Sequence, residues 1–483
     1  MAIQKADLEG LNPSDYHLIA IRKTLAKIPR KETRKKPLSV AELTDLELLL
    51  TDAFLLYGSH LLSGRINPEF IDPGWDANRR EADLASILQA ALDLNRISES
   101  VEAILPPHSG YQGMRRALAH YRKIAAKGGW SSIPSGPKMF KDMRDQRVQA
   151  VRMRLVAEGY LQVGSNVDEE FFDDTLEEAV RRFQERHGLD IDGVVGAATL
   201  AELNVPVEDR VCQIKLNMER WRWLPQDLGE RYVLVNIASF ELEVIEKGRA
   251  VMKMRVVVGR DYRHTPVFSA KMTHLVLSPY WYVPQKIATE DKLPQMQKDP
   301  TYLARHKMKV FDDWGPEAEE IDPGTIDWLQ VNTENFNYIL RQEPGPDNEL
   351  GRVKFIFPNR HNVYLHDSPS SRVLFWKSVR TFSSGCIRIH KPIELAEYLL
   401  RGDPNWTREQ ILAVIDKGVE QRVDLLEPIP VHLLYWTAWV DEDGSIQFRK
   451  DIYGRDNLLD DTLSAASPMP GGVNVRGYKS HRS

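Results

Sequence analysis

The chain has 483 residues, of which 42% are hydrophobic and 28% are charged, and its formal net charge is -5. This composition is typical of a globular protein of several domains, and it excludes collagen-like, disulfide-rich and wholly disordered chains. The mild negative charge gives no general attraction to nucleic acid. Apolar runs fall short of the ~18 residues that span a bilayer, and the first residues lack the pattern of a signal peptide, so we expect neither feature in this sequence.

The first third of the chain is predicted to hold a polar leading segment and a helical scaffold domain. Residues 1–39 include a basic stretch at 22–36. We interpret the leading segment as solvated and flexible, the alternative being a basic arm attracted to an anionic surface. From 40 to 145 apolar residues recur at helical spacing, as Leu46 and Leu50 do, which indicates an all-helical scaffold.

Residues 146–207 form a predicted compact unit. Leu176, Val180 and Phe183 lie on one face of a predicted helix, and Gly188 follows it in a place suited to a left-handed C-cap. The stretch FDDTLEEAVRRFQERHGLDIDGVVGAATLAELN closely resembles the small three-helix peptidoglycan-binding domain. The resemblance implies affinity for the cell wall, but it designates no ligand-contacting residue.

A linking helix is predicted over 208–230, and it carries Cys212, one of only two cysteines. Apolar residues surround Cys212 at helical spacing, and no histidine lies near it in the sequence, so we interpret it as a small packing residue. Two cysteines are too few for a disulfide framework or a cysteine-rich zinc site.

Strand periodicity replaces helical periodicity from 231 to 458, which predicts a mainly β domain and an α+β protein as a whole. The strand series is interrupted by 284–351, a proline-rich stretch too long for a plain loop. We interpret this insertion as a mobile lid with an irregular structure and without a core of its own. Residues 459–483 are predicted to form a disordered tail.

Cys386 has neighbours that are unusual for a buried structural cysteine. Ser384 and Gly385 precede it, and a glycine there removes bulk and lets backbone N–H groups face a ligand. Arg388 lies on the same face of an extended segment, where a cation favours the thiolate. His366, at the end of an upstream strand, is a candidate base for the thiol.

The combined pattern, Tyr364-Leu365-His366 followed by Ser-Ser-Gly-Cys-Ile-Arg-Ile at 383–389, is similar to the signature of the L,D-transpeptidases. The resemblance covers about 225–455. Together with the two preceding modules it resembles the large multidomain Gram-negative branch of that family. Many relatives have a second histidine two residues before the cysteine, where this chain has Ser384; the role of Ser384 stays open.

The resemblance implies a reaction on peptidoglycan stem peptides without a cofactor. Cys386 would attack the third residue of a donor tetrapeptide, release D-Ala and pass the acyl group to a diaminopimelate amine, which makes a 3→3 cross-link. His366 would move the protons, and backbone N–H groups around Ser384, Gly385 and Cys386 would stabilise the oxyanion. The resemblance also implies a role in cell-wall biogenesis and cell shape, a periplasmic location and reaction with carbapenems. Protein partners are unknown.

The remaining candidate residues each have two interpretations. Arg388 could bind a substrate carboxylate or hold the cysteine loop by a salt bridge. Tyr364 could line the donor groove or only pack, and Trp281 could form a cleft wall or belong to the core. His361 and His390 flank the site, but no dense ligand motif accompanies them, and we expect no metal.

Several functions share the same nucleophile. Water as the acceptor would make an L,D-carboxypeptidase, and a protein lysine would make an enzyme that attaches proteins to the wall. A non-catalytic wall-binding scaffold is disfavoured because such a module has no use for Cys386 and His366. An oxidising compartment would permit a disulfide between Cys212 and Cys386, but we expect two free thiols.

Overall fold

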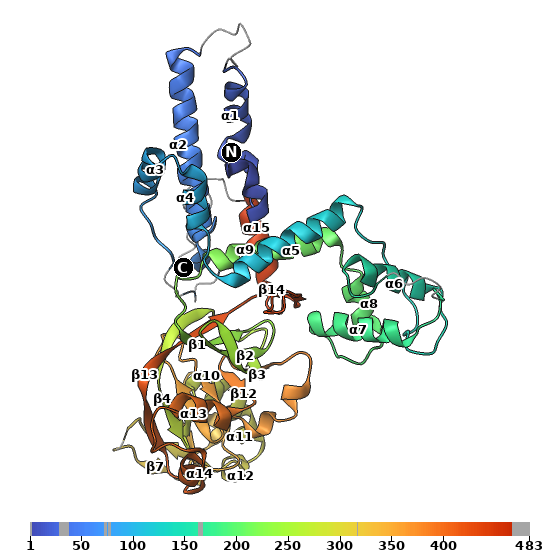
Figure 1. Ribbon diagram of the computed structural model, residues 1–483. Helices are drawn as coiled ribbons and strands as arrows, with labels where there is room; N and C mark the ends of the chain where they lie inside the picture. The colour runs from blue at the N-terminus through green and yellow to red at the C-terminus, as the bar shows by residue number, and fades with distance from the viewer. Residues whose placement is uncertain are drawn as a thin grey trace. The chain divides into compact units, whose positions relative to one another are not determined.

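The computed structural model describes residues 2–28, 38–71, 75, 79–162, 168–315 and 317–465. The chain divides into two compact units, one made of Met1–Leu228 with Trp436–Ser483 and the other of Gly229–Tyr435. The predicted α+β class is confirmed, because long helices dominate the first unit and strands the second (Figure 1). Most of the basic stretch at 22–36 and the end of the predicted tail, 466–483, lie outside the described residues.

The prediction of a flexible leading segment is wrong for residues 2–28. This part forms η1 (Ala2–Glu9), η2 (Pro13–Tyr16) and α1 (Leu18–Leu25), and its Tyr16 is buried. The buried Glu9 carboxylate accepts a hydrogen bond from the Tyr111 hydroxyl at 2.9 Å and pairs with Arg115 at 2.7 Å. These partners lie about a hundred residues away in the sequence, so local composition could not reveal them.

The helical scaffold that was predicted from periodicity is present. Ser39 and Glu42 form a capping box at the start of its longest helix, which explains why the helix begins there. Its elements are α2 (Val40–Ser63), η3 (Pro68–Phe70), α3 (Leu84–Asp93), α4 (Ile97–Ile104) and α5 (Ser109–Ala126). The linking helix that carries Cys212 is α9 (Val207–Arg222).

Three helices form the region predicted to resemble a peptidoglycan-binding domain: α6 (Arg147–Ala157), α7 (Asp174–Arg186) and α8 (Ala197–Leu203). Leu176, Val180 and Phe183 are fully buried on one face of α7, as its spacing predicts. Asp173 caps α7 by accepting a hydrogen bond from the Leu176 amide at 2.8 Å. Gly188, at a φ of 64°, ends it as expected.

The last described segment belongs to the first unit, whereas the β domain was predicted to run to 458. It forms β14 (Ala438–Val440), β15 (Ile446–Phe448) and α15 (Arg455–Ala465). The Gln213 amide on α9 donates to the carbonyls of Thr437 and Arg449, both at 3.0 Å. The prediction of disorder from 459 onward is wrong as far as residue 465, because α15 packs against α9.

The second unit is built on a nine-stranded sheet in the order β11-β3-β12-β10-β9-β4-β13-β1-β2. β3 also pairs with β2, so the sheet closes on itself. Helices α13 (Pro392–Leu400) and α14 (Arg408–Asp416) contact this sheet (Figure 1). The strands are β1 (Arg231–Asn236), β2 (Glu241–Glu246), β3 (Arg249–Gly259), β4 (Phe268–Leu277), β9 (Val353–Ile356), β10 (Leu365–His366), β11 (Thr381–Ser383), β12 (Ile387–Ile389) and β13 (Gln421–Leu434).

The insertion at 284–351 has a core, and the prediction of an irregular structure without one is wrong. Its buried cluster includes Leu293, Met296, Val310 and Leu340. A four-stranded sheet in the order β5-β8-β6-β7 supports this core. Its strands are β5 (Trp281–Tyr282), β6 (Met308–Phe311), β7 (Glu320–Ile321) and β8 (Ile339–Gln342), and its helices are α10 (Gln285–Ile287), the π-helix η4 (Ala288–Lys292), α11 (Leu293–Lys298) and α12 (Tyr302–Arg305).

A search of the described residues finds no helix that is both long enough and apolar enough to cross a membrane.

Candidate active site

Two neighbouring parallel strands carry the candidate catalytic residues. β10 and β12 pair with Leu365 opposite Ile387 and His366 opposite Arg388, and the Ile387 amide donates to the Tyr364 carbonyl at 3.1 Å. Since side chains alternate along a strand, Tyr364 and His366 share a face with Cys386 and Arg388, while Leu365 and Ile387 are buried on the other. The register therefore brings the predicted site residues together.

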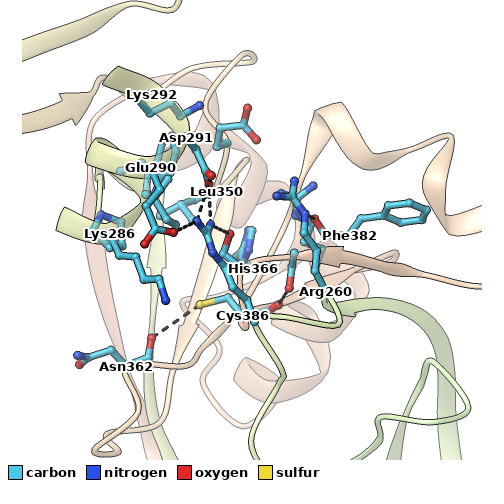
Figure 2. A pocket seen from close by; sticks show the side chains of 18 of the residues that line it. Arg260, Lys286, Glu290, Asp291, Lys292, Leu350, Asn362, His366, Phe382 and Cys386 are labelled. Carbon is cyan, nitrogen blue, oxygen red and sulfur yellow. Dashed lines mark hydrogen bonds and ion pairs between the residues drawn. The ribbon is translucent and has the colours of Figure 1, made fainter. Parts of the chain in front are cut away.

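A cavity of about 690 Å³ opens over this face. Cys386, His366, Tyr364, Arg388 and Trp281 all line it, so every side chain proposed from the sequence as catalytic or substrate-binding faces one space. The insertion supplies the opposite wall, which includes Lys286, Glu290, Asp291, Lys292 and Pro294. Figure 2 shows Lys286 pointing toward the Cys386 sulfur.

The His366 ring has a defined orientation. Its Nδ1 lies 2.6 Å from the backbone carbonyl oxygen of Asp367. Because a carbonyl can only accept, Nδ1 carries the proton and Nε2 keeps its lone pair, which makes Nε2 the basic atom. Burial, assisted by the positive charge of Arg388, lowers the pKa of His366 to about 3. The imidazole is therefore neutral at pH 7 and able to accept a proton.

The Asp367 carboxylate does not orient His366. It accepts hydrogen bonds from the Arg352 amide at 3.0 Å and from Arg352 Nε at 2.9 Å. Its other oxygen accepts from the Ser368 amide at 2.9 Å. Asp367 therefore supports the histidine through its backbone carbonyl and not through its carboxylate, so the two residues do not form a carboxylate–histidine dyad.

The Cys386 thiol is protonated at rest. Burial raises its pKa, while the Tyr364 amide and the charges of Lys354 and Arg388 act in the opposite direction. Its Sγ lies 3.7 Å from the Asn362 carbonyl oxygen, a distance that fits a weak S–H donor. The two groups that line the cavity at rest are thus a neutral thiol and a neutral imidazole, rather than a thiolate and an imidazolium.

Hydrogen bonds hold the turn before Cys386 from both sides. Ser383 Oγ donates to the Cys386 carbonyl at 2.5 Å and accepts from the Gly385 amide at 3.1 Å. Thr265 Oγ1 donates to the Gly385 carbonyl at 2.8 Å. Gly385 has a φ of 116°, which other residues adopt only with strain, so the turn requires glycine.

The hydrogen bond made by the Gly385 amide changes which groups can form the expected oxyanion site. Because this N–H is bonded to Ser383, it does not face a ligand, contrary to the sequence-based expectation. Within the described parts of the chain, the amides of Ser384 and Cys386 donate to no other group. These two are the donors that the turn leaves for a substrate oxygen, and the Cys386 amide is on the nucleophile itself.

Ser384 and Arg388 have partners that their sequence positions did not indicate. Ser384 Oγ accepts a hydrogen bond from Arg263 Nη1 at 2.8 Å. Arg388 donates to the hydroxyl of Ser371, which anchors its guanidinium beside the cavity. Trp281 lines the cavity and also belongs to the insertion core, so both interpretations of this residue hold.

Lys354 is a site residue that sequence reasoning missed. It lies opposite His366 in the β9–β10 pairing, and its Nζ is 4.1 Å from the ring centroid of Tyr364. Burial lowers its pKa, while the nearby Cys386 raises it. Buried Val353 and Phe355 flank it on the other face of β9. The single signal in the sequence was a lysine between these two apolar strand residues.

The two further histidines differ in position. His361 lines the cavity with the residues above. His390 lies beyond β12 and contacts the rings of Phe375 at 5.3 Å and Trp376 at 5.5 Å between centroids. The structure therefore does not bring His390 to the candidate site.

Comparison with known families agrees with this geometry. An L,D-transpeptidase catalytic domain matches residues 230–407, a putative peptidoglycan-binding domain matches 144–203, and a scaffold domain matches 1–118. Residues 230–407 are thus assigned to the L,D-transpeptidase family as its catalytic domain. The catalytic match contains every candidate residue on β9, β10 and β12, and the peptidoglycan-binding match contains α6, α7 and α8.

Among curated relatives, a putative L,D-transpeptidase of Haemophilus influenzae is 35% identical over 247 residues. The match covers 51% of this chain and 48% of the relative, so the chain spans about half of that protein's length. Among solved structures, an L,D-transpeptidase from Mycobacterium smegmatis is 13% identical and covers 42% of this chain and 58% of its own, with a TM-score of 0.19. One from Xylanimonas cellulosilytica is 16% identical and covers 62% and 98%, with a TM-score of 0.18. With scores this low, the family assignment rests on the sequence matches.

Proposed function

We propose that the protein is a peptidoglycan L,D-transpeptidase that works through a thioester on Cys386. The observation that carries this proposal is the placement of Cys386 and a neutral, Nε2-basic His366 on one strand face of a cavity large enough for a peptide. The peptidoglycan-binding match fits a substrate that is part of the cell wall. An enzyme acting on that substrate would work outside the cytoplasm, and in a Gram-negative cell in the periplasm.

In the first half-reaction, His366 Nε2 takes the thiol proton while Sγ attacks the carbonyl carbon of the third residue of the donor stem. The Cys386 amide donates to the developing oxyanion, and one such donor contributes ~3–4 kcal/mol in comparable sites. The C–N bond to D-Ala then breaks, and the protonated His366 gives its proton to the departing amine. Lys354 and Arg388 favour the anionic sulfur during this step.

In the second half-reaction, the side-chain amine of an acceptor stem attacks the thioester. His366 accepts a proton from that amine, the C–S bond breaks, and the proton returns to the Cys386 sulfur. The product is a 3→3 cross-link and a regenerated thiol. Water in place of the amine would give hydrolysis, and a protein lysine would give attachment of a protein to the wall.

The insertion favours the amine over water by covering the cavity. One wall of the cavity consists of insertion residues, which include Lys286 and Glu290 (Figure 2). Charges of both signs suit stem peptides, because these carry carboxylates and, on the acceptor, an amine. As a mobile lid, the insertion would close on the donor and exclude water from the thioester.

A product analysis tests the proposal. Purified protein is incubated with disaccharide-tetrapeptide, and mass spectrometry follows D-Ala, tripeptide and dimer. We expect D-Ala release and a 3→3 dimer, and neither product from Cys386→Ala. Tripeptide without dimer would identify a carboxypeptidase, and no D-Ala release by the unaltered protein would refute the acyl-transfer proposal.

A further inference from the structure

Arg263 connects the insertion to the turn that holds Cys386. Its Nη1 lies 2.6 Å from Asp291 Oδ2 and donates to Ser384 Oγ at 2.8 Å. Its Nη2 lies 2.6 Å from Glu290 Oε2 and 3.1 Å from Asp291 Oδ1. Figure 2 shows Glu290 and Asp291 on the insertion side of the cavity, across from the Cys386 side. One guanidinium therefore bonds both walls of the active-site cavity.

The Arg263 side chain is only 6% exposed, although both of its carboxylate partners are partly solvated, at 47% for Glu290 and 31% for Asp291. The planar fork of an arginine binds a carboxylate with two parallel bonds, which fixes geometry as well as energy. Both acids lie on the π-helix η4, a form that is frequent at functional sites.

The turn that carries Arg263 also reaches the cysteine loop a second time. Thr265, two residues on, donates to the Gly385 carbonyl at 2.8 Å. A Cβ on Gly259 would lie 2.1 Å from the Arg263 carbonyl oxygen, so the chain folds back tightly here. Arg263 and Thr265 thus support the loop on either side of the Ser384–Gly385 peptide, whose neighbouring amides are the proposed oxyanion donors.

We propose that Arg263 is a positioning residue, which sets the Ser384–Cys386 turn for oxyanion binding when the insertion closes over the cavity. The proposal rests on the acyl-transfer function proposed above and explains the role of Ser384, whose hydroxyl is the acceptor through which Arg263 holds the turn. When Glu290 and Asp291 withdraw with the insertion, the guanidinium loses the partners that fix its orientation. Arg263 then no longer holds the turn through Ser384. Acylation is then efficient only with the insertion closed.

The test separates acylation from simple thiol reactivity. A carbapenem acylates Cys386 through a tetrahedral oxyanion, whereas iodoacetamide alkylates the same sulfur without one. Both rates are measured by intact-mass and peptide-mass spectrometry in the full chain, with Cys212 as an internal reference thiol. We expect Arg263→Ala to lower the carbapenem rate at least tenfold while changing the iodoacetamide rate less than threefold. Arg263→Lys keeps the charge but lacks the planar fork, so its carbapenem rate should lie between those of Arg263→Ala and the unaltered protein.

A matched control and a mutant cycle complete the design. Arg408 pairs with Glu397 at 3.0 Å outside the cavity, and Arg408→Ala should leave both rates within twofold of the unaltered protein. Ser384→Ala should also slow acylation, and the Arg263→Ala/Ser384→Ala double variant should be no slower than Arg263→Ala alone. Additive losses would overturn the proposed coupling.

The remaining outcomes are also decisive. If Arg263→Ala fails to fold, Glu290→Gln with Asp291→Asn tests the same link and should reproduce the selective loss of acylation. Equal loss of both rates in a folded variant, or no loss of either, would overturn the proposal. If the unaltered protein forms no carbapenem adduct on Cys386, the acyl-transfer function itself is wrong, which is a separate result.

Discussion

The two cysteines lie in two different units and show what makes a thiol reactive. Burial raises the pKa of both, that of Cys212 to about 11. The groups around Cys212 on α9 include the carboxylates of Asp460 and Asp456, which oppose the thiolate further, and the cation of Lys215, which partly offsets them. Around Cys386 the charged groups are Lys354 and Arg388, which favour it. A raised resting pKa is thus common to both sites, and the difference lies in the cations, the base and the open cavity.

The largest expected effect comes from removing the nucleophile. Cys386→Ala should abolish carbapenem adducts and cross-linked product, because the other cysteine, Cys212, does not line the cavity with His366. Intact-mass spectrometry detects the adduct directly, and an unchanged melting temperature shows that the fold is retained. Dimer formation by Cys386→Ala at the original rate would show that Cys386 is not the reactive one of the two cysteines.

Removing the base should have the next largest effect. His366→Ala should slow acylation by roughly a hundredfold or more, the usual contribution of a positioned general base. Stopped-flow or time-resolved mass spectrometry with a carbapenem measures this rate. His390→Ala is a suitable control because His390 contacts Phe375 and Trp376 instead of the cavity. A greater loss of the acylation rate in Ser384→Ala than in His366→Ala would show that the roles of general base and of support for the turn are assigned to the wrong residues.

The charge difference between the two thiols gives a third prediction. Lys354→Met should raise the pKa of Cys386 further and slow its acylation several-fold, because the cation that favours the anionic sulfur is removed. Lys271→Met on the exposed side of β4 is the matched control and should have no effect. The pH dependence of iodoacetamide alkylation reports the pKa; an unaltered profile would mean that Lys354 does not act on the sulfur.

The burial of His366 predicts a pH dependence of stability. Its pKa falls from an ordinary value near ~6.5 when unfolded to about 3 when folded, so below ~6.5 the unfolded state binds a proton that the folded state excludes. The free energy of unfolding should therefore decline as the pH drops from ~6.5 toward 3, and this decline should be smaller in His366→Gln. Urea unfolding at several pH values measures it, and parallel slopes for both proteins would contradict the assignment.

The smallest effect is expected for the other thiol. Cys212→Ser should leave the rates of acylation and cross-linking within twofold, because Cys212 has no base beside it and its pKa is about 11. Steady-state assays check this, with thermal unfolding to detect any loss of packing. Loss of turnover at normal stability would show that both thiols matter.

Much of the fold followed from periodicity. The helices between 40 and 126 and the first strands after 231 lie where residue spacing predicts them, because the burial of one face imposes its period on the sequence. Periodicity did not predict that the leading segment and the end of the chain are ordered. Their order depends on partners such as Tyr111 for Glu9 and Gln213 for Thr437, which are distant in sequence.

The sequence by itself determined the candidate nucleophile and base, because Ser-Ser-Gly-Cys-Ile-Arg and a strand ending in His366 are local patterns. Only the tertiary structure decided which groups act on them. Strand register placed Lys354 opposite His366, and a turn after β3 brought Arg263 to Ser384. It also decided that the Gly385 amide is bonded to Ser383. Local spacing reports which face a residue occupies, whereas these contacts depend on pairing between segments that only the folded chain brings together.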